Sequence, residues 1–430
     1  MRRAVVTGLG VVAPGGTGVR GYWDLLTAGR TATGALTRFD PSGFRSRVAA
    51  EAEFDELGRG LSLTEALRLD RVAQFAVAGA REALIDSGLA DSGLADSGPV
   101  GSGPAGAADP MRRAVSLGSA LGCASSLDRE FATAATATGT AFGHARAAER
   151  LYDYFVPSSM AAEVARAVGA QGPVSLLSTG CTSGLDALGH ALDLIREGIA
   201  DVVVAGASEA PISPMTLASF DAVRIASHHR NDDPAGAARP FDRTRDGFVL
   251  GEGAALFVVE ELEHARRRGA RVYGEIAGFG SRSSAFHMTA LRTGGADLAE
   301  AVRAALDEAR LDPGAVDHVA AHGSGTRSGD VHETVALKRA LGAHAHRVPV
   351  SAVASMIGYS LGALGALAVA ACLLAVQHGV VPPTANLHEP DPVCDLDYTP
   401  VTAREQRVGA ALTVGSGFGG THSALLVTRV

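Results

Sequence analysis

The sequence predicts an α/β protein in which parallel strands are covered by helices. Apolar runs with strand character at residues 4–7, 174–177 and 201–205 alternate with segments of helical periodicity at residues 22–28 and 69–86. The composition agrees, because 47% hydrophobic residues with only 5% aromatics and 53 glycines favour close packing of helices and strands through small side chains. A chain of 430 residues is also long enough for a large core.

The first predicted element is the strand at residues 4–7, which follows the N-terminal Met-Arg-Arg directly. No apolar segment with a cleavage site precedes it, as a secretory signal would require. We therefore expect a cytoplasmic protein.

A weak internal symmetry predicts two related halves. Residues 174–198 read as a strand, a tight turn, a helix of small residues and a glycine, and residues 348–379 repeat this order. The strand-like run at 272–280 restarts the pattern that begins at residues 5–10. We interpret residues 1–265 as an N-terminal half and residues 266–430 as a C-terminal half, joined by a charged helix at 260–268.

One segment of the N-terminal half lacks the composition of a packed element. The sequence LADSG occurs twice in tandem from Leu89 to Gly98 and runs into Gly-, Pro- and Ala-rich sequence up to Pro110. Such a stretch has too little apolar surface to offset the entropy of ordering it. We expect an exposed, mobile loop over residues 90–112.

Charge and hydropathy exclude several partners. A net charge of −8 gives no electrostatic reason to bind nucleic acid or an acidic membrane. Residues 357–376 contain no charged side chain and are long enough to cross a bilayer, but their many Gly and Ala residues favour a helix buried in a soluble core. We expect neither nucleic acid nor membrane as a partner.

The cysteines do not predict a metal site or a disulfide framework. Cys123, Cys181, Cys372 and Cys394 are scattered without CxxC spacing. Three of them are expected to be small buried hydrophobic residues. We predict no metal and no diffusible cofactor.

Cys181 is the candidate nucleophile. It lies between the strand at 174–177 and a helix predicted at 185–197, so the thiol is expected at a strand-to-helix turn on a helix N-terminus. There the helix dipole and free backbone N–H groups favour the thiolate, and the same N–H groups provide half of an oxyanion hole. The alternative is an inert core cysteine in a glycine-rich turn.

His322 is the candidate base or hydrogen-bond donor. It follows a strand-like run at 316–321 and opens a loop in which Ser324 and Thr326 offer hydroxyl groups to a polar ligand. Alternatively, it is a loop histidine that bonds to the backbone. Near the C-terminus, GSGFGGTH at 415–422 follows a strand at 411–414 and forms either a plain hairpin or a loop that brings the Phe418 N–H to a ligand.

Four segments in this order resemble the β-ketoacyl synthases of the thiolase fold: TGCTSGLD (179–186), RPFDRTRDGFVLGEGA (239–254), AHGSGT (321–326) and GSGFGGT (415–421). The likeness covers nearly the whole chain and is strongest to the ketosynthase α subunits of type II polyketide synthases. It implies a thiolase-like fold of duplicated αβαβα halves with mixed five-stranded sheets. It also implies an acyltransferase that takes its substrate from the phosphopantetheine of an acyl carrier protein and forms a homodimer or a heterodimer with a ketosynthase-like subunit.

The resemblance assigns roles to individual residues. Cys181 is the nucleophile and His322 is the first catalytic histidine, while the N–H groups of Cys181 and Phe418 form the oxyanion hole. Ser324, Thr326 and Phe418 lie along the pantetheine arm. Asp330 and Glu333 match the acidic positions behind the histidine.

The third catalytic loop departs from the family. The pattern Lys-Ser-x-x-Gly-His-Ser-x-Gly-Ala reads ASMIGYSLGA at 354–363, so Ala354 replaces the lysine and Tyr359 replaces the second histidine. Loss of one oxyanion donor costs about two to three powers of ten in rate, so malonyl decarboxylation should be crippled. The Tyr359 hydroxyl remains able to donate a hydrogen bond or relay a proton.

Three hypotheses follow. The leading one is an enzyme of polyketide-type specialised metabolism in which Cys181 is acylated and a non-decarboxylative reaction follows, either aldol and lactone cyclisation or acyl transfer, with His322 and Tyr359 moving protons. The second is orthodox decarboxylative chain extension with a chain-length subunit. The third is a non-catalytic subunit that docks carrier proteins, which retention of Cys181 disfavours.

Overall fold

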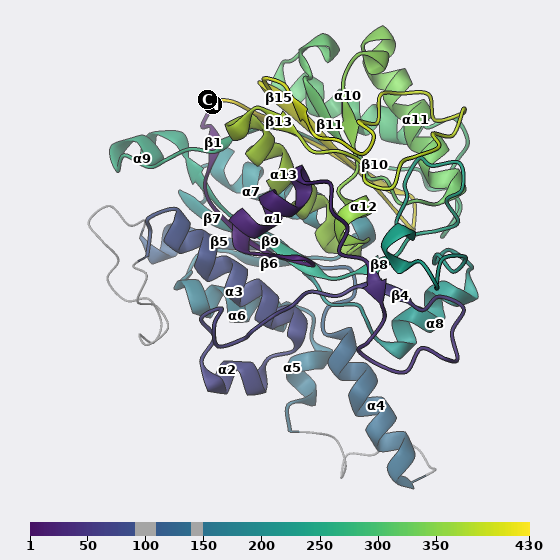
Figure 1. Ribbon diagram of the computed structural model, residues 1–430. Helices are drawn as coiled ribbons and strands as arrows, with labels where there is room; N and C mark the ends of the chain where they lie inside the picture. The colour runs from purple at the N-terminus through teal and green to yellow at the C-terminus, as the bar shows by residue number, and fades with distance from the viewer. Residues whose placement is uncertain (91–108, 139–148) are drawn as a thin grey trace.

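The computed structural model describes residues 1–90, 109–138 and 149–430. Its principal strands form one continuous path, β12-β11-β15-β16-β10-β1-β9-β7-β5-β6, in which two five-stranded groups meet at β1 and β10 (Figure 1). The bounds of these strands are β1 (Ala4–Ala13), β5 (Arg113–Gly118), β6 (Val174–Leu177), β7 (Val202–Glu209), β9 (Gly253–Glu261), β10 (Gly274–Ser283), β11 (His318–Ala320), β12 (Val350–Ser351), β15 (Ala410–Gly417) and β16 (Thr421–Thr428).

The two groups share one topology. In each group the third strand in chain order lies at the outer edge, followed by the second, fourth, fifth and first. The pairing also matches, since β5 is parallel to both β6 and β7 while β9 is antiparallel to β7 and β1. In the second group β11 is parallel to β12 and β15, while β16 is antiparallel to β15 and β10. The predicted α/β fold with duplicated mixed sheets is therefore confirmed.

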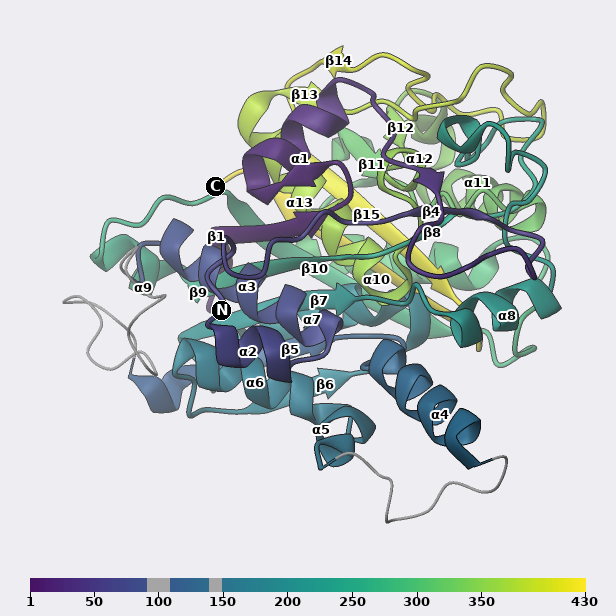
Figure 2. The same cartoon turned by 60° about the horizontal axis from the view of Figure 1, so that its bottom comes forward.

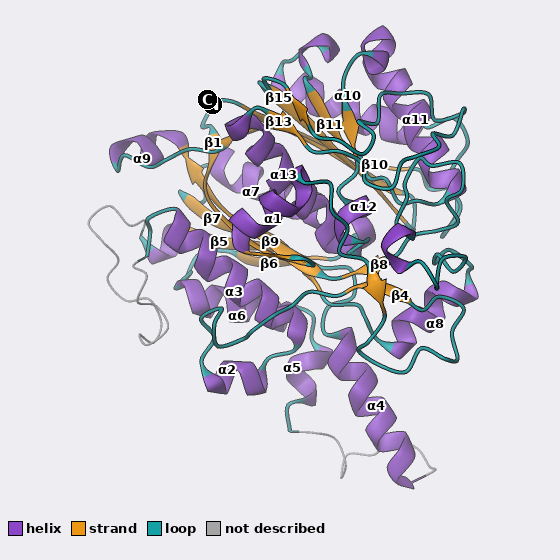
Figure 3. Ribbon diagram, in the orientation of Figure 1, coloured by secondary structure: helices purple, strands orange, loops and turns teal. Residues whose placement is uncertain are grey.

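Helices form three layers around the two sheets (Figures 2 and 3). The helices α3 (Arg71–Asp86) and α6 (Ser158–Val168) cover the outer face of the first sheet, and α10 (Ala296–Ala309) and α11 (Arg327–Leu341) lie over the second. Between the sheets lie α7 (Ser183–Arg196), which contacts strands of both, and α13 (Leu364–His378). This arrangement is the expected αβαβα layering.

The remaining helices and strands surround this core. They are β2 (Gly16–Thr17), α1 (Gly18–Thr27), β3 (Gly34–Ala35), β4 (Val48–Ala50), α2 (Leu63–Arg68), α4 (Ala124–Thr138), α5 (Leu151–Phe155), α8 (Pro214–Ala222), β8 (Leu250–Gly251), α9 (Leu262–Arg267), α12 (Ala354–Ile357), β13 (Val380–Val381) and β14 (Arg404–Glu405). The charged helix expected at 260–268 is α9, which is shorter than expected. Glu260 belongs to strand β9 instead, where its buried carboxylate accepts hydrogen bonds from Thr7 and Arg268. The proposed division at residues 265 and 266 falls inside this helix and stays an interpretation.

The apolar segment near residue 360 is a core helix, as predicted. One helical stretch, Leu361–His378, is long and apolar enough to cross a membrane, but 89% of it is buried inside the protein. Its packing is close, because a Cβ on Gly365 would lie 2.7 Å from Leu185 Cγ of α7. The central helices therefore depend on small residues at their contact.

Two further predictions concern the cysteines and the repeat-rich loop. Cys123, Cys372 and Cys394 are buried as expected. Residues 91–108 lie outside the described residues, so the expectation of an exposed loop over 90–112 is tested only at its ends. Ala90 is buried, contrary to this expectation, whereas Asp109, Pro110 and Met111 are exposed as expected and Pro110–Arg112 form a 3₁₀ turn in which Arg112 pairs with Asp201.

Candidate active site

Cys181 lies on the predicted strand-to-helix turn. Strand β6 ends at Leu177, residues Gly180–Thr182 form a 3₁₀ turn, and α7 begins at Ser183. Gly180 has φ = +67°, a conformation that favours glycine. The turn is fastened by Ser183, whose hydroxyl accepts from the Thr179 N–H at 3.0 Å and donates to the Gly180 carbonyl at 2.6 Å. The thiol is thus held at the N-terminal end of a buried helix.

The buried carboxylate of Asp186 supports this turn and was not singled out from the sequence. It accepts hydrogen bonds from the hydroxyls of Thr179 and Thr182, the latter at 2.9 Å. It also accepts from the Ser423 hydroxyl of β16. Asp186 thereby ties the cysteine turn to the second half of the molecule. Its place in the first turn of the helix after Cys181 was the available signal.

The glycine-rich C-terminal segment is a hairpin that also reaches the thiol. Strands β15 and β16 are paired, and the connecting turn contains Phe418 with Gly419 and Gly420 at φ = +86° and +79°. The Thr421 hydroxyl donates to the Thr179 carbonyl at 3.1 Å. The backbone N–H groups of Phe418 and Cys181 both lie near the Cys181 sulfur, where they lower the pKa of the thiol in part. An oxyanion hole needs these donors to point at the carbonyl oxygen of a bound substrate, so this role of the two N–H groups stays a prediction.

His322 and Tyr359 are hydrogen-bonded to each other beside the thiol. The Tyr359 hydroxyl lies 2.8 Å from His322 Nε2, with the two rings at 90°. The same hydroxyl hydrogen-bonds Cys181. Tyr359 is fixed because its N–H donates to the Val249 carbonyl at 2.7 Å and its ring packs 4.9 Å from that of Phe248. The three predicted catalytic residues thus form one network.

Burial keeps all three groups in their neutral forms at neutral pH. Burial raises the pKa of Cys181 to about 11, although the hydrogen bond from Tyr359 lowers it in part. Burial also raises the pKa of Tyr359 well above its ordinary value and lowers the pKa of His322 to about 4. The expectation that a helix N-terminus favours a resting thiolate is therefore corrected, since desolvation outweighs it.

Glu333 lies behind the histidine loop. Its carboxylate accepts the N–H groups of His322 and Gly323 at 2.7 and 2.9 Å. Among the described residues it forms no ion pair, and burial raises its pKa to about 8. A protonated Glu333 at neutral pH follows, as expected for a carboxyl group that has lost its lysine. Ala354, in the lysine position, is buried in α12.

Asp330 fixes the other end of the same loop. It accepts the N–H groups of Phe241 and Gly325 at 2.8 and 3.0 Å and pairs with the buried Arg245 at 3.1 Å. Burial nevertheless raises its pKa to about 6. Asp330 therefore anchors the loop of Ser324 and does not line the cavity.

A cavity of about 120 Å³ opens onto the Cys181, His322 and Tyr359 network. Ser324, Thr326 and Phe418 line it, so all three residues predicted to contact the pantetheine arm lie at its surface. The two hydroxyl groups bond to each other at 2.9 Å, and Thr326 also caps α11. Their contact with a ligand stays a prediction.

The apolar wall of the cavity was missed by the sequence analysis. It consists mainly of Phe220, Ile225, Phe248, Leu291 and Leu361. These residues come from separate segments without a shared motif, so no local pattern identified them. Leu361 has φ = +46°, which is strained for a leucine and is held by the tightly packed loop after Tyr359.

Glu209 is a second missed residue. This fully buried carboxylate accepts the N–H groups of Ala120, Leu121 and Gly362 at 2.7, 3.2 and 3.2 Å. Burial raises its pKa to about 7. Because Gly362 follows Tyr359 closely, Glu209 positions the tyrosine loop against the first sheet.

Comparison with protein families gives two adjacent matches. The family described as "Beta-ketoacyl synthase, N-terminal domain" matches residues 1–265, and "Beta-ketoacyl synthase, C-terminal domain" matches residues 273–388.

Curated relatives match over the full length. The chain is 56% identical over 429 residues to the tetracenomycin polyketide synthase ketoacyl synthase alpha subunit of Streptomyces glaucescens, covering 100% of this chain and 97% of the relative. It is 54% identical to the actinorhodin polyketide putative beta-ketoacyl synthase 1 of Streptomyces coelicolor, covering 99% and 88%.

Solved structures share the fold. One is a type II polyketide ketosynthase in complex with its acyl carrier protein and bound to the hexaketide, with a TM-score of 0.90, 35% identity and coverage of 100% and 99%. Another is the ishigamide ketosynthase/chain length factor, with a TM-score of 0.88, 32% identity and the same coverage.

Proposed function

Because the chain belongs to the β-ketoacyl synthase family, we propose that it loads an acyl chain onto Cys181 and then acts without decarboxylating an extender unit. The predicted family and the predicted class of acyl-transferring enzyme are both confirmed by the full-length matches. The chain is a polyketide ketosynthase of the α-subunit type with a thiolase-like fold. The non-decarboxylative second step is the finer part of the proposal.

The observation that carries the proposal is the position of the Tyr359 hydroxyl between Cys181 and His322 Nε2. A buried phenol with a pKa raised well above its ordinary value stays protonated, so it serves as a relay and not as a phenolate base. His322 is neutral because burial lowers its pKa to about 4, and its Nε2 can accept a proton. The network therefore forms a path from thiol through phenol to imidazole.

Loading uses this path. As the Cys181 sulfur attacks the carrier thioester carbonyl, its proton passes to the Tyr359 oxygen and the phenolic proton moves to His322 Nε2. The new carbon–sulfur bond leaves a tetrahedral oxyanion that the N–H groups of Cys181 and Phe418 stabilise. Collapse of this intermediate expels the pantetheine thiolate, which takes the proton from His322. The products are an acyl-Cys181 and a free carrier thiol.

The same residues disfavour the usual second step. Decarboxylation of a malonyl unit requires donors for the enolate oxygen, and here Ala354 and Tyr359 stand where the family has lysine and histidine. Glu333 is buried and protonated, and Ala354 in the lysine position supplies no cation to the malonyl carboxylate. Two altered donors together would cost several powers of ten in rate.

A β-keto chain on Cys181 offers another course. Its α-proton is acidic, so neutral His322 can remove it and form an enolate that adds to a carbonyl further along the chain. The resulting alkoxide then attacks the Cys181 thioester and expels the sulfur as a lactone forms. Cys181 recovers its proton from His322 through Tyr359. Transfer of the acyl group to an external acceptor would use the same first step.

The partners follow from the family. Since a similar structure holds a ketosynthase with its acyl carrier protein and another is a ketosynthase/chain length factor, we expect this chain to take substrate from an acyl carrier protein. We also expect it to pair with a second ketosynthase-like subunit or with itself. A cytoplasmic location, no cofactor and no contact with nucleic acid or membrane complete the proposal.

Orthodox chain extension is the second candidate, favoured by 51% to 56% identity to putative polyketide ketosynthases across the whole chain. In that case Tyr359 would replace the second histidine as enolate donor. A non-catalytic docking subunit is the third, and the intact Cys181 network argues against it.

Intact-mass spectrometry tests the loading step. The protein is mixed with acyl and β-ketoacyl carrier thioesters, and we expect an adduct on wild-type protein that is absent from the Cys181→Ala variant. A β-ketoacyl adduct should then decay with release of a cyclised or transferred product. Failure to form any adduct while the protein is folded would favour the docking subunit.

A further inference from the structure

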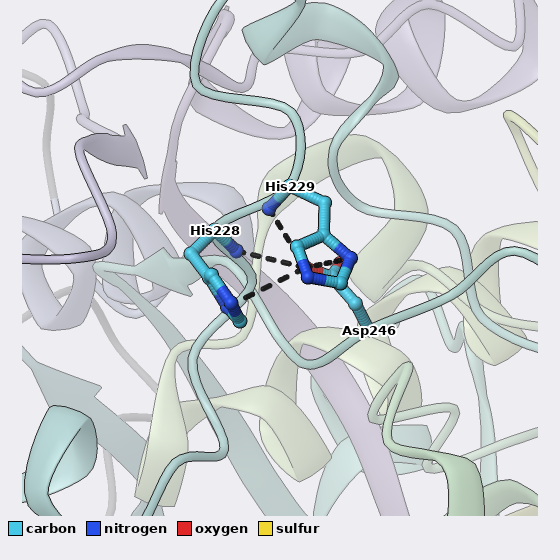
Figure 4. A group of neighbouring side chains, drawn as sticks. All are labelled: His228, His229 and Asp246. Atoms are coloured by element: carbon cyan, nitrogen blue, oxygen red, sulfur yellow. Dashed lines mark hydrogen bonds and ion pairs between the residues drawn. The ribbon is translucent and has the colours of Figure 1, made fainter.

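A cluster of two histidines and one aspartate lies outside the active site. His228 and His229 follow α8, and Asp246 precedes β8 (Figure 4). One ligand atom from each residue lies within 4.8 Å of the other two. Adjacent histidines carry no metal-binding spacing of their own, so the sequence did not indicate this cluster.

The aspartate is held in place. Its side chain is 4% exposed, its Oδ1 accepts from the Ser227 hydroxyl at 2.6 Å, and its Oδ2 accepts the N–H groups of His228 and His229, both at 2.9 Å. Burial alone would raise the pKa of Asp246, but these hydrogen bonds outweigh it and the pKa is lowered. A carboxylate has about four acceptor positions; the two N–H groups take those of Oδ2 and the Ser227 hydroxyl takes one of Oδ1, so the position left for a cation is on Oδ1.

Both imidazoles turn the same nitrogen toward this carboxylate. His228 Nδ1 and His229 Nδ1 lie 3.7 and 3.6 Å from Asp246 Oδ2. These distances are too long for hydrogen bonds. They are close to the edge of a tetrahedral zinc site, which is about 3.4 Å for bonds of about 2.0–2.1 Å. The two rings are tilted against each other with centroids 4.3 Å apart.

We propose that His228, His229 and Asp246 bind a divalent transition-metal ion of the class that prefers imidazole and carboxylate ligands, with Zn²⁺ as the ion to test. The site is accessible, because the side chain of His229 is 66% exposed and that of His228 is 34% exposed. His228 Nδ1 lies 3.4 Å from the Ala226 carbonyl oxygen, so metal binding requires this nitrogen to give up that hydrogen bond and, like His229 Nδ1, to turn its lone pair onto an ion held by Asp246. Either water or Asp232 completes the coordination, since Asp232 lines the same surface hollow as His229.

A metal here would fix one wall of the acyl cavity. Phe248 follows Asp246 by two residues and exchanges backbone hydrogen bonds with Ile225 and Ser227 at 3.0 and 2.8 Å. Ile225 and Phe248 line the cavity, and Phe248 packs on Tyr359. The ion would hold the loop of residues 227–229 against the segment that carries Asp246 and Phe248, because it is coordinated by residues of both.

Calorimetric titration of tag-free protein with Zn²⁺ tests the site. The titration uses Cys181→Ala protein, because the active-site thiol and His322 could themselves bind zinc. We expect one ion per chain. On the same background, replacing both His228 and His229 by Ala should weaken binding by on the order of 100-fold or more, since loss of a supporting residue alone costs about 10- to 100-fold. Replacement of the exposed His346 by Ala is the matched control and should leave binding unchanged.

Electron paramagnetic resonance with Cu²⁺ supplies a second readout. We expect nitrogen hyperfine structure from two imidazoles in the Cys181→Ala protein and its loss in the His228→Ala/His229→Ala variant, with circular dichroism verifying that the variant is folded. No saturable zinc binding by the Cys181→Ala protein, or equal binding by the folded double-histidine variant, would overturn the proposal.

Discussion

The Tyr359 hydroxyl lies 2.8 Å from His322 Nε2 and hydrogen-bonds the Cys181 sulfur as well. A single side chain thus connects the nucleophile to the imidazole of His322, which also lines the cavity. In the family pattern a second histidine occupies this position. Its imidazole becomes positively charged when it takes up a proton, whereas the phenol of Tyr359 stays neutral while it donates a hydrogen bond.

Replacing Tyr359 by Phe should slow alkylation of Cys181 by iodoacetamide by about ten-fold or more, because a hydrogen bond to a charged group contributes about 1.5–3 kcal/mol. Burial raises the pKa of Cys181 to about 11, and the hydrogen bond from Tyr359 lowers it in part. Removal of this hydrogen bond should therefore raise the pKa of Cys181 further. Alkylation rates measured across pH check both effects. The exposed Tyr152 provides the control, since its replacement by Phe should change neither.

Ionisation of Glu333 should make stability fall as the pH rises. Its folded-state pKa of about 8 exceeds the ordinary value of 4.5, so its contribution to the free energy of unfolding is complete below pH 4.5 and is lost progressively toward pH 8. The loss should be on the order of a few kcal/mol. Glu333→Gln should flatten the decline of the free energy of unfolding measured by urea denaturation between about pH 5 and pH 8, whereas the exposed Glu53→Gln should follow the wild type.

Substitution of Gly420 by Ala should displace the turn between β15 and β16, which carries the Phe418 N–H predicted for the oxyanion hole. A Cβ there would lie 2.1 Å from the Ser284 hydroxyl, and φ is +79°. Gly60 is the matched control, because it has φ = +80° but open space around its Cβ. Both variants share the backbone cost of about 1 kcal/mol, so a larger loss of stability and of Cys181 acylation in Gly420→Ala isolates the steric term. Equal effects would show that the turn tolerates movement.

Removal of the Asp330 carboxylate should unfold the histidine loop. Asp330→Asn leaves the buried Arg245 with only the half-buried Asp391 as an ionic partner, and loss of one member of a buried pair costs about 3–5 kcal/mol. The exposed pair of Arg20 and Asp24 is the comparison, where Asp24→Asn should have little effect on stability. Denaturant midpoints compare the two.

The sequence predicted the layers and the candidate catalytic residues because both depend on local patterns. Cys181, His322 and Phe418 each lie in the turn or loop that follows a strand, so their placement follows largely from the order of the elements. Tyr359 was identified because it departs, together with Ala354, from a motif whose other positions are kept.

Other features depend on long-range packing that local patterns do not record. Glu209 lies 153 residues from its partner Gly362, and the apolar cavity wall joins segments from both halves. The sign of the Cys181 pKa shift was predicted wrongly for the same reason. Desolvation depends on everything that surrounds the sulfur, while the helix N-terminus is visible in the sequence.

Carbon dioxide release from malonyl carrier protein tests the central claim most directly. The wild-type protein should release it no faster than malonyl carrier protein does in buffer without enzyme. The double variant Ala354→Lys/Tyr359→His, which restores the lysine and the histidine, should release it faster by about two powers of ten or more, which is the effect on rate of one oxyanion donor. Rapid release by the wild type coupled to chain growth would contradict the proposal and identify the chain as an orthodox extending ketosynthase.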